Sequence, residues 1–303
     1  DEGRFGYHYI NGRDRIRRPL IRSPETISPA TITGAASSGI QVQHARLIPT
    51  TWENLLPELR ANLAEAARRH GPAVAGVLSP FLTCEEAFLL AKYLKGLSGE
   101  VHLALGPVPT VGEDDTYPKD RRGRPVQAVK FTIHAEKCPN RRGVEEILRH
   151  FQGKVIGFDD IVHSAKEGRL QAVYLAAAYP PRQPAWISEE QAAAFEQVPL
   201  VILQDLFESP ISRFAHYVIP AASFAEKDGT FVNHQGLAQA IHRAIRPPQE
   251  CRTDGQAFLD LAQRRGLVHA PTLRAELARE VPYFEPLSSG ELGEYGVLLQ
   301  TTK

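Results

Sequence analysis

Helix-length amphipathic segments alternate with short apolar runs along most of this chain, and this alternation constrains the fold more than any other sequence feature. Over residues 51–71, apolar residues recur at three-to-four-residue spacing, with Thr51 placed to cap a helix and Gly71 to end it. A nearly continuous apolar run of strand length follows at residues 73–80. Buried strands that are separated by helices are typical of a parallel sheet.

The same alternation continues to residue 266. Further helices are predicted at 83–99 with Thr83 as cap, 141–151, 159–168 with Asp159 as cap, 188–197 with Ser188 as cap, and 254–266. Further strands are predicted at 101–105, 154–158, 172–178, 200–206 and 216–222. Residues 106–127 are expected to form a surface loop and residues 227–241 a loop or hairpin. The predicted class is α/β, with a Rossmann-like, doubly wound, mostly parallel sheet.

Three regions follow from this pattern. Residues 1–50 are rich in Arg, Pro, Ser and Thr without a sustained period, which predicts an extended basic arm and linker. Residues 51–266 form the α/β domain, either as one unit or as two lobes, 51–126 and 127–266. Residues 267–303 are expected to form a C-terminal tail with one short helical piece.

Composition excludes several classes of protein. The 35 Lys and Arg residues balance the 35 Asp and Glu residues, so no net field attracts nucleic acid or an anionic membrane surface. No apolar stretch reaches the ~20 residues of a membrane-spanning helix, and no signal-peptide pattern opens the chain. The three cysteines, Cys84, Cys138 and Cys251, are too few and too far apart for a disulfide framework or a metal cluster, which indicates reduced thiols in a cytoplasmic protein. Because the chain contains no Met, we expect it either to start inside a longer gene product or to be a processed or trimmed form.

Sequence motifs indicate no catalytic site. The sequence lacks GxGxxG, GxxxxGK[ST], HExxH and GxSxG, and its eleven histidines are not placed at metal-ligand spacing. Polar segments at 177–180, 204–210 and 226–236 follow predicted strands, at the edge where open α/β sheets bind ligands. Such segments either line a ligand cleft or only form turns.

Two segments carry a long and specific match to the pattern of a known family. They are "QDLFESPISRFAHYVIPAASFAEKDGTFVNHQG" and "IRPPQECRTDGQAFLDLA", which resemble the end of the third domain of the molybdopterin oxidoreductase family. Upstream segments match in the same order: "DEGRFGYHYINGRDRIRRPLIR", "GPAVAGVLSPFLTCEEAFLLAKYLKGL" and "CPNRRGVEEIL". The opening DEGRF, together with PNRRG, is closer to the large iron-sulfur subunits of bacterial NADH:quinone oxidoreductase (complex I) and their hydrogenase and formate dehydrogenase relatives than to periplasmic reductases. Among these, the chain as a whole most resembles the complex I subunit.

Four departures from the family pattern fall where its cofactor binds. Catalytic members carry Lys at the position of Glu2, between an iron-sulfur cluster and the pterin. The family's glycine-containing strand-end loop is replaced by a segment with Ala177 and a bulky Tyr179. Pro210 interrupts the family's T-E-T segment, and Leu237 replaces a phosphate-binding Arg. The resemblance therefore implies a cofactor-free chain, in which a pterin dinucleotide would meet side chains instead of space.

The implied function is structural. The chain would belong to an oxidoreductase complex without being catalytic itself, and would support electron transfer from NADH through iron-sulfur clusters in a missing N-terminal region or in partner subunits. Its partners would be the other subunits of an NADH-oxidising respiratory complex, with no nucleic acid and no direct membrane insertion. Its location would be cytoplasmic, peripheral on the inner face of the cell membrane through that complex. Neither a catalytic residue nor a metal ligand is predicted.

Two alternatives stay open. The first is a catalytic fragment of a molybdenum or tungsten oxidoreductase such as formate dehydrogenase. The second is a nucleotide-binding module that uses the vestigial cleft of Gln204, Asp205, Thr230 and Asn233. The arginines of the arm either tie the iron-sulfur region to this domain or form a solvated charge run. They are Arg4, Arg13, Arg15, Arg17, Arg18 and Arg22.

Overall fold

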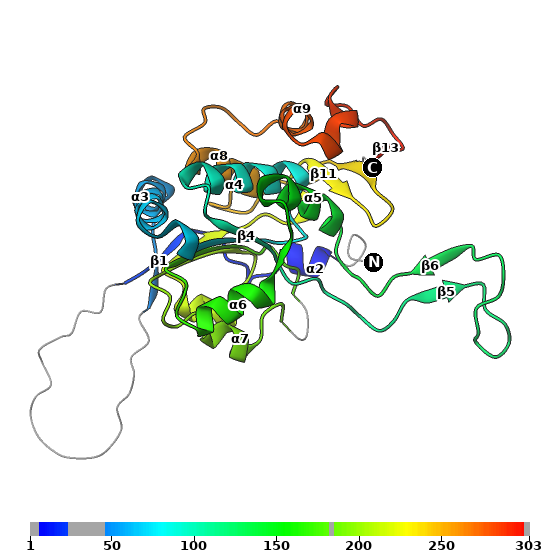
Figure 1. Cartoon of the computed structure of the whole chain (residues 1–303), viewed down its shortest axis with the longest axis horizontal. Coiled ribbons are helices and arrows are strands. Elements are labelled where there is room, and N and C mark those ends of the chain that lie inside the picture. Colours follow the sequence, from blue (N-terminus) through cyan, green and yellow to red (C-terminus); the bar gives the residue numbers. More distant parts are fainter. Residues whose placement is uncertain (1–5, 24–45, 182–184, 300–303) are drawn as a thin grey trace, which may run out of the picture.

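In a computed structural model that describes residues 6–23, 46–181 and 185–299, a mixed sheet lies between two layers of helices (Figure 1). Eight described strands are hydrogen-bonded in the order β2-β1-β10-β9-β8-β3-β4-β7. Their bounds are β1 Leu20–Arg22, β2 Leu47–Pro49, β3 Val74–Leu78, β4 His102–Leu105, β7 Ile156–Gly157, β8 Ala172–Ala176, β9 Leu200–Asp205 and β10 Tyr217–Pro220. The six strands from β10 to β7 are parallel, which confirms the predicted α/β class with a mostly parallel sheet. One continuous sheet runs through both of the lobes considered above.

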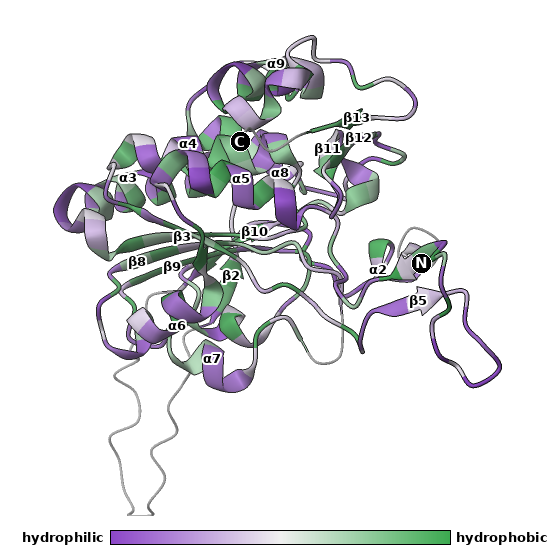
Figure 2. Ribbon diagram, turned by 45° about the vertical axis from the view of Figure 1, so that its right-hand side comes forward, coloured by the Kyte–Doolittle hydropathy of each residue, from purple (hydrophilic) through white to green (hydrophobic). Residues whose placement is uncertain are grey.

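Helices cover both faces of this sheet, as a doubly wound fold requires (Figures 1 and 2). One face carries α3 Trp52–His70, α4 Cys84–Leu97, α5 Arg141–Gln152 and α8 Asp254–Leu261, with α9 Ala270–Glu280 packed on α4. The other face carries α6 Phe158–Lys166 and α7 Glu189–Ala193. Every residue of β3, β8 and β9 is buried, so their unbroken apolar runs form the centre of the core.

Local capping explains where the helices begin. As predicted, the Thr51, Thr83 and Ser188 side chains accept hydrogen bonds from backbone N–H groups at the start of α3, α4 and α7. The predicted cap at Asp159 is wrong. The N-cap of α6 is Gly157, two residues earlier, and the Asp160 carboxylate reaches back to accept from the Gly157 N–H at 3.1 Å.

The described part of the N-terminal arm, residues 6–23, contains regular structure that the sequence pattern did not predict. It forms the short helix α2 Tyr7–Ile10 and the strand β1, which pairs antiparallel with β10, while β2 pairs with β1. This pairing covers the edge of β10, whose backbone groups would otherwise be left without partners. Residues 1–5 and 24–45, which include Glu2, lie outside the described residues.

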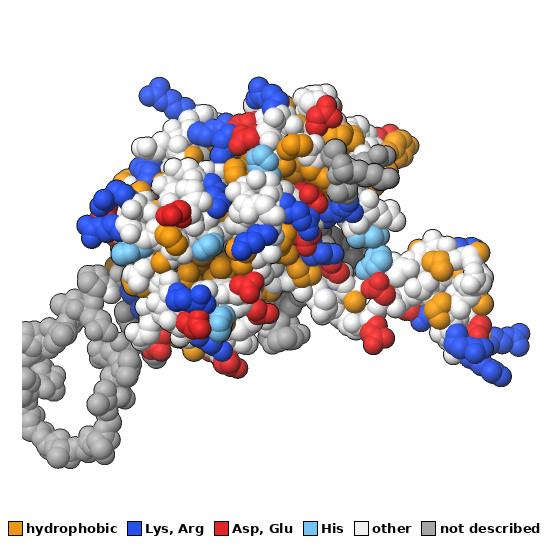
Figure 3. All heavy atoms as spheres, viewed as in Figure 1, with side chains coloured by type: hydrophobic (Ala, Val, Ile, Leu, Met, Phe, Trp, Pro, Cys, Tyr) orange, Lys and Arg blue, Asp and Glu red, His pale blue; other side chains and the backbone are white. Residues whose placement is uncertain are grey.

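A two-stranded hairpin replaces most of the surface loop expected at 106–127. Its strands are β5 Asp115–Tyr117 and β6 Phe131–Ile133, and it projects from the body of the molecule (Figure 1). Tyr117 stacks on Phe131 across the strands, with ring centroids 5.0 Å apart. Lys and Arg side chains gather at its far end (Figure 3).

The C-terminal region is more ordered than expected. A predicted hairpin is confirmed as β11 Gly229–Val232 and β12 Leu237–Ile241, and β13 Val297–Leu298 adds to it as a third strand. Short 3-10 helices complete the described chain: η1 Gly71–Ala73, η2 Pro210–Phe214, η3 Phe224–Glu226 and η4 Pro282–Leu287. Among the described residues, no helix combines the length and the apolar character needed to cross a membrane.

Candidate functional site

The order of the strands places the expected ligand crevice between β3 and β8. From β3 the chain proceeds outward to β4 and β7, and then returns to the other side of β3 to form β8, β9 and β10. Open α/β sheets bind ligands where this direction reverses, at the carboxyl ends of the strands. Residues 79–83 after β3 and residues 177–180 after β8 meet at this point, and the Ser79 N–H donates to the Ala176 carbonyl at 3.0 Å.

Tyr179 fills this crevice. Its side chain is buried, its ring lies 5.2 Å from that of Phe81, and it stacks on Trp186 at 5.1 Å. Its hydroxyl crosses the end of the sheet and donates to the carbonyl of Pro107 at 2.8 Å. Gly106 makes this approach possible, because a Cβ there would lie 2.6 Å from the Tyr179 hydroxyl and 3.2 Å from the backbone of Ser79.

A cavity of about 710 Å³ remains beside the filled crevice, and we call it the strand-end cavity. Its walls come from the ends of β8, β9 and β10, from α2 and from the base of the β5–β6 hairpin. They include Tyr9, Phe81, Ile133, Cys138, Ala178, Pro180, Leu206, Ser223, Phe224, Lys227 and Phe231. This mostly apolar lining suits an apolar group.

The polar side chains that line the strand-end cavity are Glu136, Lys137, Cys138, Ser223 and Lys227. Burial raises the pKa of the Cys138 thiol, with the Glu136 carboxylate adding to the effect, so the sulfur stays protonated. The Ser223 hydroxyl is buried and finds no hydrogen-bond partner in the described part of the chain. Among the described residues that line the cavity, only Ser223 has a buried side-chain oxygen without a hydrogen-bond partner. This oxygen could therefore form a hydrogen bond to a ligand in the cavity.

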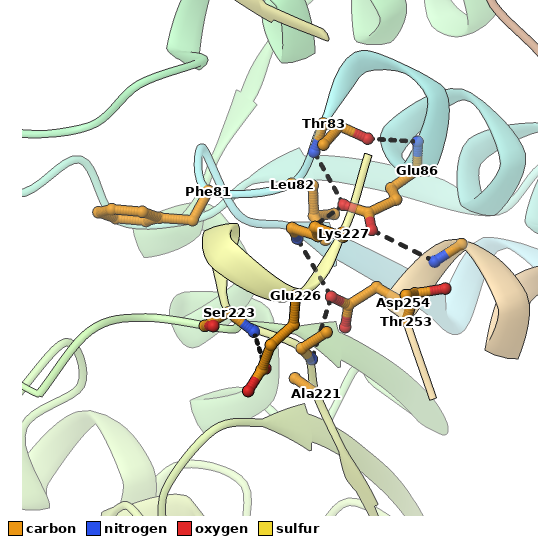
Figure 4. Close-up of polar contacts among 12 residues, drawn as sticks. Phe81, Leu82, Thr83, Glu86, Ala221, Ser223, Glu226, Lys227, Thr253 and Asp254 are labelled. Atoms are coloured by element: carbon orange, nitrogen blue, oxygen red, sulfur yellow. Dashed lines mark hydrogen bonds and ion pairs between the residues drawn. The ribbon is translucent and has the colours of Figure 1, made fainter. Parts of the chain in front are cut away.

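Lys227 also reaches the cavity wall, but its ammonium group is held inside the protein (Figure 4). It donates to Glu86 at 2.8 Å and to Asp254 at 3.1 Å, and all three side chains are buried. The Glu86 carboxylate also accepts from the backbone N–H groups of Thr83 and Gly255, at the starts of α4 and α8. Burial alone would lower the pKa of Lys227, but the two carboxylates outweigh it and raise that pKa.

Gln204, one of the predicted cleft residues, belongs to the same buried network. Its amide oxygen accepts from the Tyr174 hydroxyl at 2.6 Å, and its amide nitrogen donates to Asp254 at 2.6 Å. Both polar ends of Gln204 are therefore bonded within the protein.

Thr230 and Asn233 lie in separate places. The Thr230 hydroxyl donates to Glu85 at 2.6 Å and accepts from Arg274 at 2.7 Å, in a second buried cluster between α4 and α9. The Asn233 oxygen accepts from the backbone N–H groups of Gln235 and Leu237, which forms the turn between β11 and β12. The structure therefore does not bring the four predicted residues together around one opening.

Asp205, the fourth predicted residue, supports the aromatic cluster in the crevice. It accepts hydrogen bonds from the Trp186 indole N–H at 2.9 Å and from the Leu206 backbone N–H at 2.8 Å. Burial raises the pKa of this carboxyl to about 7, against the opposing effect of these donors.

An Asp205→Asn variant should therefore lose a specific pH dependence of stability. A carboxyl whose pKa is about 4 unfolded and about 7 folded binds its proton more tightly in the folded state. The contribution of protonated Asp205 to the free energy of unfolding is complete below pH ~4. It is lost as the pH rises to ~7, by up to roughly 1.4 kcal/mol per pH unit. Urea unfolding from pH 4 to 8 should show this decline in wild type and a flatter curve in the variant. Parallel curves would contradict the assigned shift.

The residues that depart from the family pattern, apart from Glu2, lie at the strand ends or begin short elements of the structure. Tyr179 fills the crevice, while Ala177 is buried beside it and its N–H donates to the Gln204 carbonyl at 2.8 Å. Pro210 begins η2, and Leu237 begins β12.

Comparisons with known proteins agree with this fold. Residues 145–264 match the family model for molybdopterin oxidoreductase. Formate dehydrogenase H from Escherichia coli (strain K12) is 28% identical over 188 residues, 61% of this chain and 25% of that protein. The NADPH-Fe(3+) oxidoreductase subunit alpha from Geobacter sulfurreducens is 30% identical over 133 residues, 41% of this chain and 15% of that protein. The chain thus spans a quarter or less of these curated relatives.

A solved structure supports the same fold at much lower identity. Acetylene hydratase from Pelobacter acetylenicus superposes with a TM-score of 0.52 at 10% identity, covering 85% of this chain and 63% of that one. The chain therefore carries a molybdopterin oxidoreductase-like region, as its sequence predicted. None of these three relatives is named as a subunit of complex I.

Proposed function

We propose that this chain is a structural, cofactor-free part of the large iron-sulfur subunit of an NADH:quinone oxidoreductase. It would hold iron-sulfur regions and neighbouring subunits in position on the inner face of the cell membrane, without moving electrons itself. The observation that carries this proposal is Tyr179, whose buried ring and hydroxyl occupy the crevice at the end of the parallel strands.

The residues at the strand ends do not fit a pterin dinucleotide. A pyrophosphate needs close approach to backbone N–H groups or free cationic side chains. Here the approach is filled by Tyr179, and the nearby Lys227 is committed to two buried carboxylates. The same crowding speaks against the nucleotide-binding alternative, for which calorimetry with guanine and nicotinamide nucleotides is expected to detect no binding.

The β5–β6 hairpin supports a role in assembly. Its strands and flanks expose the apolar side chains of Val111, Val129, Phe131 and Ile133, each about half or more exposed. The far end, residues 119–130, carries five basic residues and one acidic residue (Figure 3). Such a projection suits a neighbouring subunit with an apolar groove and an acidic rim.

Elemental analysis of the intact protein, purified with its native partners, tests the proposal. We expect no stoichiometric molybdenum or tungsten and no extractable pterin, together with iron-sulfur clusters and NADH-oxidising subunits in the same preparation. Stoichiometric molybdenum or tungsten with pterin would contradict the cofactor-free assignment. Absence of NADH-oxidising subunits from an intact preparation would contradict the complex I assignment.

A second candidate is a catalytic fragment of a molybdenum or tungsten oxidoreductase such as formate dehydrogenase. The names of several relatives favour it, including formate dehydrogenase H and a putative formate dehydrogenase from Staphylococcus aureus, 29% identical over 143 residues. In that case, the same preparation would contain the metal and pterin and would reduce an artificial electron acceptor with formate. Neither result is expected under the structural proposal.

A further inference from the structure

Two histidines face each other where the β5–β6 hairpin joins the body of the protein. His134 follows β6 directly, and His234 lies in the turn between β11 and β12, a hundred residues later. Their Nε2 atoms are 3.1 Å apart and their ring centroids 4.2 Å apart. Histidine side chains gather at this junction on the surface in Figure 3. The pair is therefore both preformed and open to solvent.

Asp114 fixes the orientation of the first ring. One of its carboxylate oxygens lies 3.0 Å from Nδ1 of His134, and the other accepts from the Ala135 backbone N–H at 2.7 Å. A carboxylate at Nδ1 favours the tautomer with the proton on that nitrogen, so Nε2 of His134 is the acceptor in the 3.1 Å contact with Nε2 of His234. A metal ion would replace this hydrogen bond, and the His234 proton would then sit on its Nδ1. Metal-binding histidines are commonly held by a carboxylate in this way.

The distance between the two rings suits a shared metal ion. With Zn–N bonds of ~2.0–2.1 Å, two imidazole nitrogens at tetrahedral angles lie about 3.3–3.4 Å apart. The observed 3.1 Å between the nitrogens needs to widen by a few tenths of an ångström. One ring must also turn, because the centroids, now 4.2 Å apart, would be about 5.2 Å apart with both nitrogens on one ion. His234 is exposed, so its ring can make this adjustment without disturbing the core.

We propose that His134 and His234 bind one divalent transition-metal ion, with Zn²⁺ as the fitting choice, and that Asp114 orients the site. Nowhere in the described residues does a set of three or more His, Cys, Asp or Glu side chains come together as metal ligands. The ion would thus have two protein ligands, and water or a carboxylate from a partner would complete its coordination. Because the ligands come from two distant segments, the metal would tie the base of the hairpin to the body.

Calorimetric titration of the tag-free full chain with zinc chloride tests this site. We expect one equivalent of Zn²⁺ whose affinity falls at least about tenfold in both His134→Gln and His234→Gln. Asp114→Asn should lower that affinity by roughly 10- to 100-fold, as loss of an orienting carboxylate does elsewhere. The matched control is His163→Gln, since His163 also contacts a carboxylate, Glu167, at 3.2 Å. That variant should bind Zn²⁺ like wild type.

Amide hydrogen exchange distinguishes Zn²⁺ bound between the two histidines from Zn²⁺ bound elsewhere on the surface. Zn²⁺ should slow amide exchange at residues 114–117 and 131–135 in wild type, but not in His234→Gln. Circular dichroism confirms that each variant is folded, which is expected because both rings lie at the surface. The proposal is overturned if no Zn²⁺ binds, or if either glutamine variant keeps the wild-type affinity. This test is independent of the proposed structural function.

Discussion

Replacing Lys227 with methionine is expected to lower the free energy of unfolding by about 3–5 kcal/mol. Methionine replaces the aliphatic stem of lysine and lacks only the ammonium group, so the change removes the charge and leaves little cavity. Glu86 and Asp254 would then be buried together without a cation, retaining only their neutral donors. Two like charges in a dry interior repel each other strongly, which is why the expected cost exceeds that of a lost hydrogen bond.

Urea unfolding of the variant at pH 7 measures this cost. Lys92→Met is the matched control, because Lys92 also bridges two carboxylates, Glu276 and Glu280, but its side chain is 43% exposed. Solvent screens that cluster, so the control should change stability by less than about 1 kcal/mol. We infer that the buried cluster of Lys227, Glu86 and Asp254 holds the starts of α4 and α8 together. Equal stability of the two variants would contradict this inference.

The sequence predicted the central sheet because its strands are buried on both faces. A strand such as β8 can only be an unbroken apolar run, and that run is visible in any sequence. The β5–β6 hairpin could not be predicted this way, since its strands have three residues each and none of these residues is fully buried. The strand β1 was also missed, because it depends on pairing with β10, nearly 200 residues later.

The candidate site was predicted only in part, for a similar reason. Tyr179 could be placed in the crevice because its position follows a predictable strand, and the structure puts its ring there. Gln204 and Thr230 were expected to line a cleft, yet both bond to charged residues from distant segments. A sequence shows which residues can form hydrogen bonds, but their partners are fixed only by tertiary packing. The one available signal was the run of three charged residues Glu226, Lys227 and Asp228, which follows the small and apolar residues after β10.

Replacing Arg15 is the second change that we expect to lower the stability of the protein strongly. It forms a two-pronged ion pair with Glu226, at 2.5 and 2.8 Å, and both side chains are almost fully buried. Arg15→Met should lower the free energy of unfolding by about 3–5 kcal/mol, because Glu226 would lose its cation while staying inside. Arg213→Met, which breaks an exposed pair with Glu189, is the control and should cost less than about 1 kcal/mol.

A double variant separates the charge from the packing. In Arg15→Met with Glu226→Leu no charge remains buried, so much of the lost stability should return. The recovery should be incomplete, because Arg15 also donates to the Ile10 and Ala221 carbonyls, each contributing about 1 kcal/mol. A double variant that is less stable than either single variant would contradict this reasoning. Faster hydrogen exchange in residues 6–23 of Arg15→Met alone would show that the pair anchors the N-terminal segment to the sheet.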